Sequence, residues 1–384
     1  MKPFPKGRLD ELLRTDDGLL TSRFPHYSRG ELREIKARYR DEKKEQEDKD
    51  SYQHVSKERD YEFLKKRNSF WETIGNTFTE AVRSLPDLPP PPHLKPPPLG
   101  EMKMESAVLV ISDVQAGSVV SSEGTGGLGN FNSSILARRI TKLFTDVGSV
   151  ANTYHRNVRT LYIFLLGDII DGSTIFEGQL RQIDTTTVKQ VTYCAETFAS
   201  HINDLSQQFD QIRIFTICGN HGRIGKKGVN DPLDNLDYLV YYMLKMRLER
   251  NPKVYLELPD SWFKVVEIMG WNFLLAHGDD ILSWLGIPWY GLQRSKWKMQ
   301  ELLQPERVDY YVVGDKHTAG DVIASNLIMN GCWPGGSEFS LKNLQVGGAP
   351  VQLFFGVDTT YGKTWTRAMY LEKPIRKSRI RVAR

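Results

Sequence analysis

The stretch TLYIFLLGDIID, residues 160–171, decides the fold. Its apolar run, residues 160–166, is rich in β-branched and aromatic residues and is typical of a strand buried on both faces of a sheet. Acidic side chains follow directly at Asp168 and Asp171. Polar side chains at the carboxyl end of a buried strand indicate an α/β sheet edge, where binding sites form in such sheets.

Further apolar runs repeat this pattern along the chain. We predict buried strands at residues 106–112, 211–219, 271–278 and 310–315. A single Asp or Asn after a strand is ordinary, because these residues begin turns and cap helices. Polar side chains at every strand end are better explained by a functional site. The side chains in question are Asp113, Gln115, Asn220, His221, Arg223, His277, Asp279, Asp280, Asp315 and His317.

Amphipathic segments separate the predicted strands. The patterns at residues 132–154, 185–209 and 231–251 predict helices. Because strands alternate with helices, we expect an α/β (α+β layered) fold with sheet inside and helices outside.

The residue types at the strand ends suit a metal centre. Carboxylate, amide oxygen and imidazole, without thiolate, are the ligands of divalent ions such as Mn²⁺, Fe²⁺ and Zn²⁺. More donors are present than one ion needs, which indicates two ions that share a carboxylate. Two ions roughly 3.5–4 Å apart polarise a phosphoryl group and activate water near neutral pH.

These motifs resemble those of the calcineurin-like metallophosphoesterases. The family pattern is DxH, GDxxD, GNH followed by Asp or Glu, a lone His after an apolar strand, and GHxH. The resemblance covers about residues 105–320 in the family's order. It implies a β-sandwich flanked by helices. The later stretches 330–340 and 350–365 resemble bacteriophage and prophage members related to DNA-repair exonucleases.

The resemblance also implies which residues bind the metals. Asp113 and His317 would bind the first ion, and Asn220 and His277 the second. Asp168 would bridge the two ions.

Three further residues receive roles from the resemblance. His221 would face the scissile phosphate and protonate the leaving oxygen without binding metal. Asp171 would hold the GDxxD turn around the metal ligands. Arg223 stands where a guanidinium could bind a phosphate, although a surface arginine in a turn is the alternative.

The sequence departs from the family pattern at two ligand positions. Gln115 stands where the first motif has His, and Asp315 replaces the first His of GHxH. Both can still bind metal as weaker ligands through oxygen, so we expect Mn²⁺ or Mg²⁺ more than Zn²⁺.

A third departure concerns the catalytic histidine. Gly222 stands where an acid usually follows the histidine of GNH. Without that acid, we expect Asp279 or Asp280 to orient His221.

Composition changes sharply along the chain. We predict a charged helical region at residues 1–85, a proline-rich linker at 86–100, the phosphoesterase domain at 101–372 and a basic tail at 373–384. In the first region, residues 28–50 are predicted to be a helix that begins with a capping box, and residues 61–85 are a second amphipathic stretch.

Overall composition limits the class of protein. The chain has 384 residues, of which 26% are charged and 40% hydrophobic, as expected of a globular protein. It has no apolar run of roughly 18 residues and no apolar leader, so we expect no membrane span and a cytoplasmic location. Its three cysteines are widely spaced, which excludes a CxxC metal site.

The substrate we expect first is a nucleic acid phosphodiester. The net charge of +4, Lys226 and Lys227 beside GNH, and the basic tail favour it, and residues 1–85 could bind DNA or a protein partner. Two alternatives stay open. A deep closed pocket would favour a phosphatase acting on a phosphoprotein or nucleotide, and the substitutions at 115, 222 and 315 would suit a decayed scaffold subunit.

Overall fold

The computed structural model describes residues 5–87 and 104–373, apart from 127–128, 156, 174, 177, 229–230, 232, 284–287 and 337–348. Within the longest helix, only the backbone is described for residues 45 and 47–71. The chain divides into two compact units, Met1–Ala81 and Val82–Arg384. Nearly all of the predicted linker and basic tail lies outside the described residues, so both stay predictions.

The first unit is helical. It contains the 3₁₀ turn η1 (Lys6–Arg8), α1 (Leu9–Arg14), α2 (Leu20–Arg23) and most of α3 (Arg29–Ser84). The predicted capping box is confirmed, because the Ser28 backbone N–H donates to Glu31 Oε2 at 2.8 Å and the Glu31 N–H donates to Ser28 Oγ at 3.3 Å. A small hydrophobic core packs α1 and α2 against the start of α3. Its buried residues are Leu12, Leu20, Phe24, Leu32 and Ile35.

The helix α3 is one continuous element, whereas the sequence suggested two amphipathic stretches. Residues 31–74 contain neither Gly nor Pro, so nothing in the backbone interrupts the helix.

The second unit contains a six-stranded sheet in the order β11-β10-β1-β2-β3-β4. Strands β1 to β4 pair in parallel, and β10 and β11 continue the sheet in antiparallel pairing. The strands are β1 (Glu105–Ile111), β2 (Val158–Leu165), β3 (Gln211–Thr216), β4 (Val254–Glu257), β10 (Val351–Asp358) and β11 (Gly362–Tyr370).

A five-stranded sheet has the order β5-β6-β7-β9-β8. In it β6, β7 and β9 are parallel, and β5 and β8 are antiparallel edge strands. The strands are β5 (Phe263–Ile268), β6 (Trp271–Ala276), β7 (Tyr310–Val313), β8 (Gly320–Val322) and β9 (Leu327–Met329).

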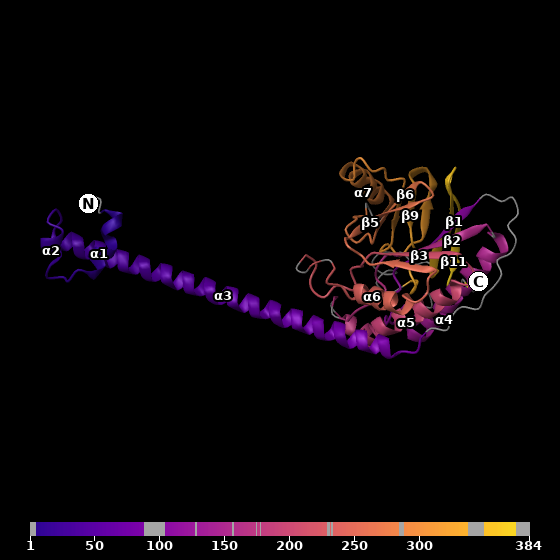
Figure 1. The fold of residues 1–384 in the computed structure, drawn as a ribbon, viewed down its shortest axis with the longest axis horizontal. Coiled ribbons are helices and arrows are strands. Elements are labelled where there is room, and N and C mark those ends of the chain that lie inside the picture. Colours follow the sequence, from indigo (N-terminus) through magenta and orange to yellow (C-terminus); the bar gives the residue numbers. More distant parts are fainter. Residues whose placement is uncertain are drawn as a thin grey trace, which may run out of the picture. The chain divides into compact units, whose positions relative to one another are not determined.

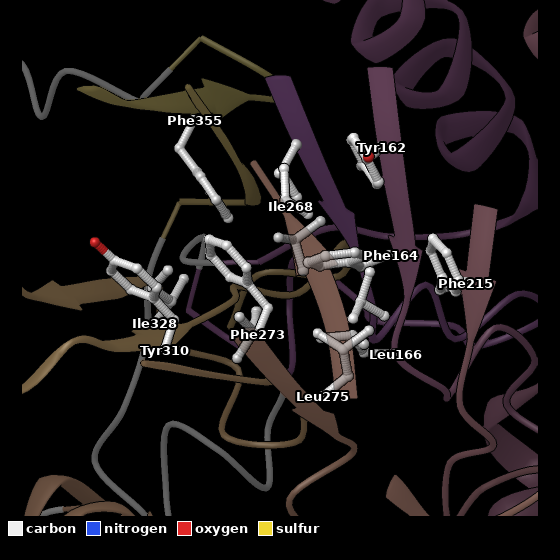
Figure 2. Packing of buried hydrophobic residues seen from close by; sticks show 14 of the residues in the cluster. Tyr162, Phe164, Leu166, Phe215, Ile268, Phe273, Leu275, Tyr310, Ile328 and Phe355 are labelled. Atoms are coloured by element: carbon white, nitrogen blue, oxygen red, sulfur yellow. The ribbon is translucent and has the colours of Figure 1, made fainter. Parts of the chain in front are cut away.

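The two sheets pack face to face. Alternate side chains of their strands form one buried cluster, in which Phe164 and Phe355 come from the larger sheet and Phe273 and Tyr310 from the smaller one (Figure 2). The rings of Phe273 and Tyr310 stack with centroids 4.6 Å apart. The expected β-sandwich is therefore confirmed.

Helices cover the outer faces of the sandwich. Figure 1 shows α4 (Ser133–Tyr154), α5 (Thr187–Leu205) and α6 (Leu236–Leu248) together beside the larger sheet, as the sequence predicts. The smaller sheet packs against α7 (Pro288–Leu302) through Leu292 and Met299. Short 3₁₀ turns occur at η2 (Gln179–Gln182) and η3 (Ile323–Ser325). Over the described ranges, none of the helices combines the length and apolar character needed to cross a membrane.

Candidate metal centre

The predicted strand ends meet at one point of the sandwich. Asp113 and Asp168 follow β1 and β2, and His277 follows β6 of the facing sheet. An oxygen of each carboxylate and a ring nitrogen of His277 all lie within 4.8 Å of one another. Their exposed fractions are 0%, 1% and 3%, so this is a buried cluster of metal-ligand types.

Two more predicted ligands lie beside Asp113. The Nε2 atom of His317 lies 3.3 Å from Asp113 Oδ1, and Nε2 of Gln115 lies 3.1 Å from the same imidazole nitrogen. The backbone N–H of Asp315 donates to Asp113 at 3.0 Å. The structure therefore groups Asp113 and His317, both predicted to bind the first ion, with Gln115, which is predicted to be a weaker ligand.

Asp315 is close to this group, but its carboxylate has another partner. Its Oδ2 accepts from Lys316 Nζ at 2.8 Å, and its Oδ1 lies 3.7 Å from His277 Nε2. The lysine thus offsets the extra negative charge that Asp315 brings to the site.

The second group contains Asp168, Asn220 and His277. The ring nitrogen His277 Nε2 lies 3.2 Å from Asp168 Oδ2 and 3.0 Å from the Asn220 amide. The other nitrogen, Nδ1, lies 2.7 Å from the carbonyl oxygen of Leu166, to which it donates when Nε2 faces the site. Burial alone would lower the pKa of His277, but Asp168, Asp315 and Asp113 raise it well above its usual value.

The donor set fits divalent ions. The end of the Asn220 amide lies 3.0 Å from both Asp168 Oδ2 and His277 Nε2. Without a cation, its NH₂ group can donate to Asp168 Oδ2, or its oxygen can accept from the protonated His277 ring. With a cation, the amide oxygen can turn to it beside a carboxylate and a neutral imidazole, which are usual ligands of Mn²⁺, Fe²⁺ and Zn²⁺.

The backbone of the site is conformationally unusual. Asp113, Gln115, Asp168, Asp315 and His317 all have φ between 48° and 59°. Left-handed conformations are uncommon for residues other than glycine and concentrate at functional sites. The loops therefore aim these side chains at the centre at some cost in backbone energy.

Asp237 holds two of these loops together, and sequence reasoning missed it. Its side chain is fully buried at the start of α6 and accepts the backbone N–H groups of Asp168 and Gly219 on Oδ2, at 2.8 and 2.9 Å. Its Oδ1 accepts those of Ile169 and Ile170 at 3.0 and 3.4 Å. Burial and the charge of Asp168 raise the pKa of Asp237 to about 6.

The neighbouring Asn235 explains one departure from the family pattern. Its Nδ2 donates to the carbonyl oxygen of Gly219 at 2.7 Å, and its Oδ1 accepts from the Asp237 N–H at 2.9 Å. A Cβ on Gly222 would lie only 2.1 Å from Asn235 Oδ1. In this chain, the position of the usual acid is therefore packed against the start of α6.

His221 is oriented by Asp171. Its Nδ1 lies 2.9 Å from Asp171 Oδ1, and its Nε2 lies 3.8 Å from Asp168 Oδ2. Burial alone would lower the pKa of His221, but Asp168 and Asp171 raise it to about 9 when no cation neutralises Asp168.

The prediction that Asp279 or Asp280 orients His221 is wrong. Both carboxylates bind Lys227, at 2.7 and 2.6 Å. The GDxxD turn instead brings Asp171 to His221, whose Nδ1 lies 3.2 Å from the Asp171 carbonyl oxygen. The close packing of the two loops requires Gly172, because a Cβ there would lie 2.7 Å from the His221 carbonyl oxygen.

Arg223 lies on the same side of the centre as His221. Its guanidinium carbon is 5.7 Å from the ring of Phe176, which in turn lies 5.0 Å from the imidazole of His221. Within the described part of the chain, its buried Nε has no hydrogen-bond partner. Arg223 also lines the cavity that adjoins Asn220 and His277.

Comparison with known proteins identifies the family of the chain. The model of the calcineurin-like phosphoesterase family matches residues 106–321. Among solved structures, wild-type Vps29 from Entamoeba histolytica, complexed with Zn²⁺, is similar at 12% identity and a TM-score of 0.29, over 69% of this chain and 99% of that chain. None of the curated protein sequences matches the chain. The chain belongs to the calcineurin-like phosphoesterase family, as its ordered strand-end motifs predict.

Proposed function

We propose that this protein is a metal-dependent phosphodiesterase and that its substrate is nucleic acid. Family membership and the Asp113, Asp168 and His277 cluster support metal-dependent hydrolysis of phosphoesters. The observation that carries the proposal is the position of a proton donor beside the metal cluster. His221 Nε2 lies 3.8 Å from Asp168 Oδ2 while Asp171 holds its other nitrogen.

Each group of side chains has one task in this proposal. One ion would be held by Asp113, Gln115 and His317. The other would be held by Asn220 and His277, and Asp168 would bind both ions. Two divalent ions, when bound, supply charge neutralisation and an activated water. We favour Mn²⁺ because Gln115 offers an amide oxygen where the family has an imidazole.

The protein groups then handle the proton and the phosphate. His221 donates its Nε2 proton to the leaving oxygen, and Asp171 fixes the ring and supports its charge. Arg223, which lines the cavity beside Asn220 and His277, binds a non-bridging phosphate oxygen with its guanidinium. Proton donation matters most for a poor leaving group such as a sugar oxygen, which nucleic acids and nucleotides share. Between them, the net charge of +4 is why we favour nucleic acid.

A second candidate is a nucleotide phosphatase. A partly open cavity of about 450 Å³ adjoins Asn220 and His277, and a space of this size suits a small ester. Whether the substrate is a small nucleotide or a nucleic acid therefore has to be tested directly.

The test compares diester, monoester and nucleic acid substrates. Metal-stripped protein, reloaded with Mn²⁺, is assayed on bis(p-nitrophenyl) phosphate, p-nitrophenyl phosphate, thymidine monophosphate and single- and double-stranded DNA. The proposal expects faster cleavage of the diester than the monoester, and cleavage of DNA. Cleavage confined to the two monoesters would establish the phosphatase instead.

A further inference from the structure

The cavity beside the metal centre is lined by residues from separate parts of the chain. They include residues 218–220, 223, 225–228, 231 and 233–235, together with Ser261, Trp262 and residues 276–281. Because Asn220 and His277 also line it, a molecule held there lies against the metal centre. Its volume of about 450 Å³ lies within the range of small-molecule sites, roughly 300–1,000 Å³.

Trp262 presents an aromatic surface to this cavity. Trp262 directly precedes β5, whose first residue Phe263 pairs with Ala276, and Ala276 directly precedes His277. Strand β5 is the edge of its sheet, and the Trp262 indole is 50% exposed, whereas the core residue Trp333 is fully buried. Phe263 supports the indole edge-on, with ring centroids 4.9 Å apart. An indole held in this way can stack against a planar ring.

The charges of the lining argue against a second phosphate in the cavity. Arg223, Lys226 and Lys227 are opposed by the carboxylates of Asp231, Asp234, Asp279 and Asp280. Lys227 is already bound to two of these carboxylates. The cavity as a whole is therefore not cationic, and it suits a neutral group with hydrogen-bonding edges.

We propose that this cavity binds the base of one nucleotide, stacked on Trp262, while the phosphate of that nucleotide lies at the metal centre. The inference rests on the proposed function, since it specifies the substrate of the same site. The nucleotide is either a free one or the end of a strand, because both present the same base, sugar and phosphate.

Direct binding tests this independently of turnover. Mn²⁺-loaded protein is titrated calorimetrically with 5′-deoxythymidine 5′-phosphonate, whose carbon–phosphorus bond resists hydrolysis, and with methylphosphonate, which lacks the nucleoside. The wild-type protein is expected to prefer the nucleoside phosphonate. Trp262→Ala is expected to reduce this preference by about 5- to 150-fold, the effect of losing one base stack. Trp262→Phe should restore most of it.

The matched control is Trp297→Ala, which removes an indole that is 64% exposed on α7 and outside the cavity. It should retain the full preference. Equal binding of both phosphonates by the wild type, or an unchanged preference in Trp262→Ala, overturns the inference even if esters are hydrolysed. A Trp262-dependent preference without any hydrolysis supports the pocket and refutes the proposed activity.

One further titration identifies the source of the base. A ten-residue phosphorothioate oligothymidylate that binds more tightly than the nucleoside phosphonate indicates a strand end. Equal or weaker binding indicates a free nucleotide.

Discussion

Replacing Asp237 by Asn tests how the site is held together. The substitution keeps the shape of the side chain but exchanges one of its two acceptor oxygens for an NH₂ group. In either orientation, two of the four backbone N–H groups from residues 168–170 and 219 lose their acceptor. Two buried, unpaired donors cost about 2–6 kcal/mol, at about 1–3 kcal/mol each.

A second effect offsets this loss. The ordinary pKa of 3.8 is raised to about 6 in Asp237, so ionising it in the folded protein costs about 3 kcal/mol. Asn carries no charge and avoids that cost. The net change in the free energy of unfolding is therefore expected to be small, from about 1 kcal/mol of stabilisation to about 3 kcal/mol of destabilisation.

Metal binding should respond far more strongly. The loops that carry Asp168 and Asn220 lose a shared anchor, and groups that orient metal ligands typically contribute 10- to 100-fold in affinity. We expect Asp237→Asn to bind Mn²⁺ about 10- to 100-fold more weakly by calorimetry, with a modest change in thermal unfolding of the metal-free protein.

The control is Asp358→Asn at the end of β10. Asp358 is also buried and accepts two backbone N–H groups, from Thr360 and Tyr361, but β10 runs antiparallel to β1 and so ends away from the metal centre. Both N–H groups bind Oδ1, which Asn retains, so this variant should keep both its stability and its metal affinity. Unaltered Mn²⁺ affinity in Asp237→Asn would refute the reasoning.

Three other substitutions separate the roles of the site residues. His221→Asn is expected to lower turnover by about 10²- to 10⁴-fold while metal content stays at the wild-type level; metal loss would make His221 a ligand. Asp171→Asn should lower the pKa of His221, so that the alkaline limb of the pH profile of kcat/KM moves about 1–2 pH units lower. An unmoved limb would show that Asp171 does not support the proton donor. Gln115→His should strengthen Zn²⁺ binding, and an identical Zn²⁺ titration would remove Gln115 from the ligand set.

The sequence predicted the centre of the fold well. Long apolar runs such as residues 160–166 are distinctive, and parallel strands must end at one edge. The sequence alone therefore places Asp168 close to its partners, as the structure does. The short strands β4, β8 and β9 have only three or four residues, which is too few for a clear period of two.

The supporting residues were harder to predict. Asp237 follows Asn235 at the start of a helix, where acidic residues are ordinary caps, so its sequence position reveals nothing of the loops it holds. Asp171 was assigned to its turn, but its contact with His221 depends on how two loops pack. The predicted roles of the ligands themselves stay predictions until metal binding is measured.

The most direct test follows hydrolysis of bis(p-nitrophenyl) phosphate while metal-stripped protein is titrated with Mn²⁺. The account predicts no activity without metal, a rise to a plateau at two ions per chain, and no activity in Asp168→Asn at any Mn²⁺ concentration. Full activity of the stripped protein, or of Asp168→Asn, would contradict a two-metal centre built around Asp168. A wild-type protein that is silent with Mn²⁺, Mg²⁺ and Zn²⁺ would contradict the proposed activity and favour a scaffold with a decayed site.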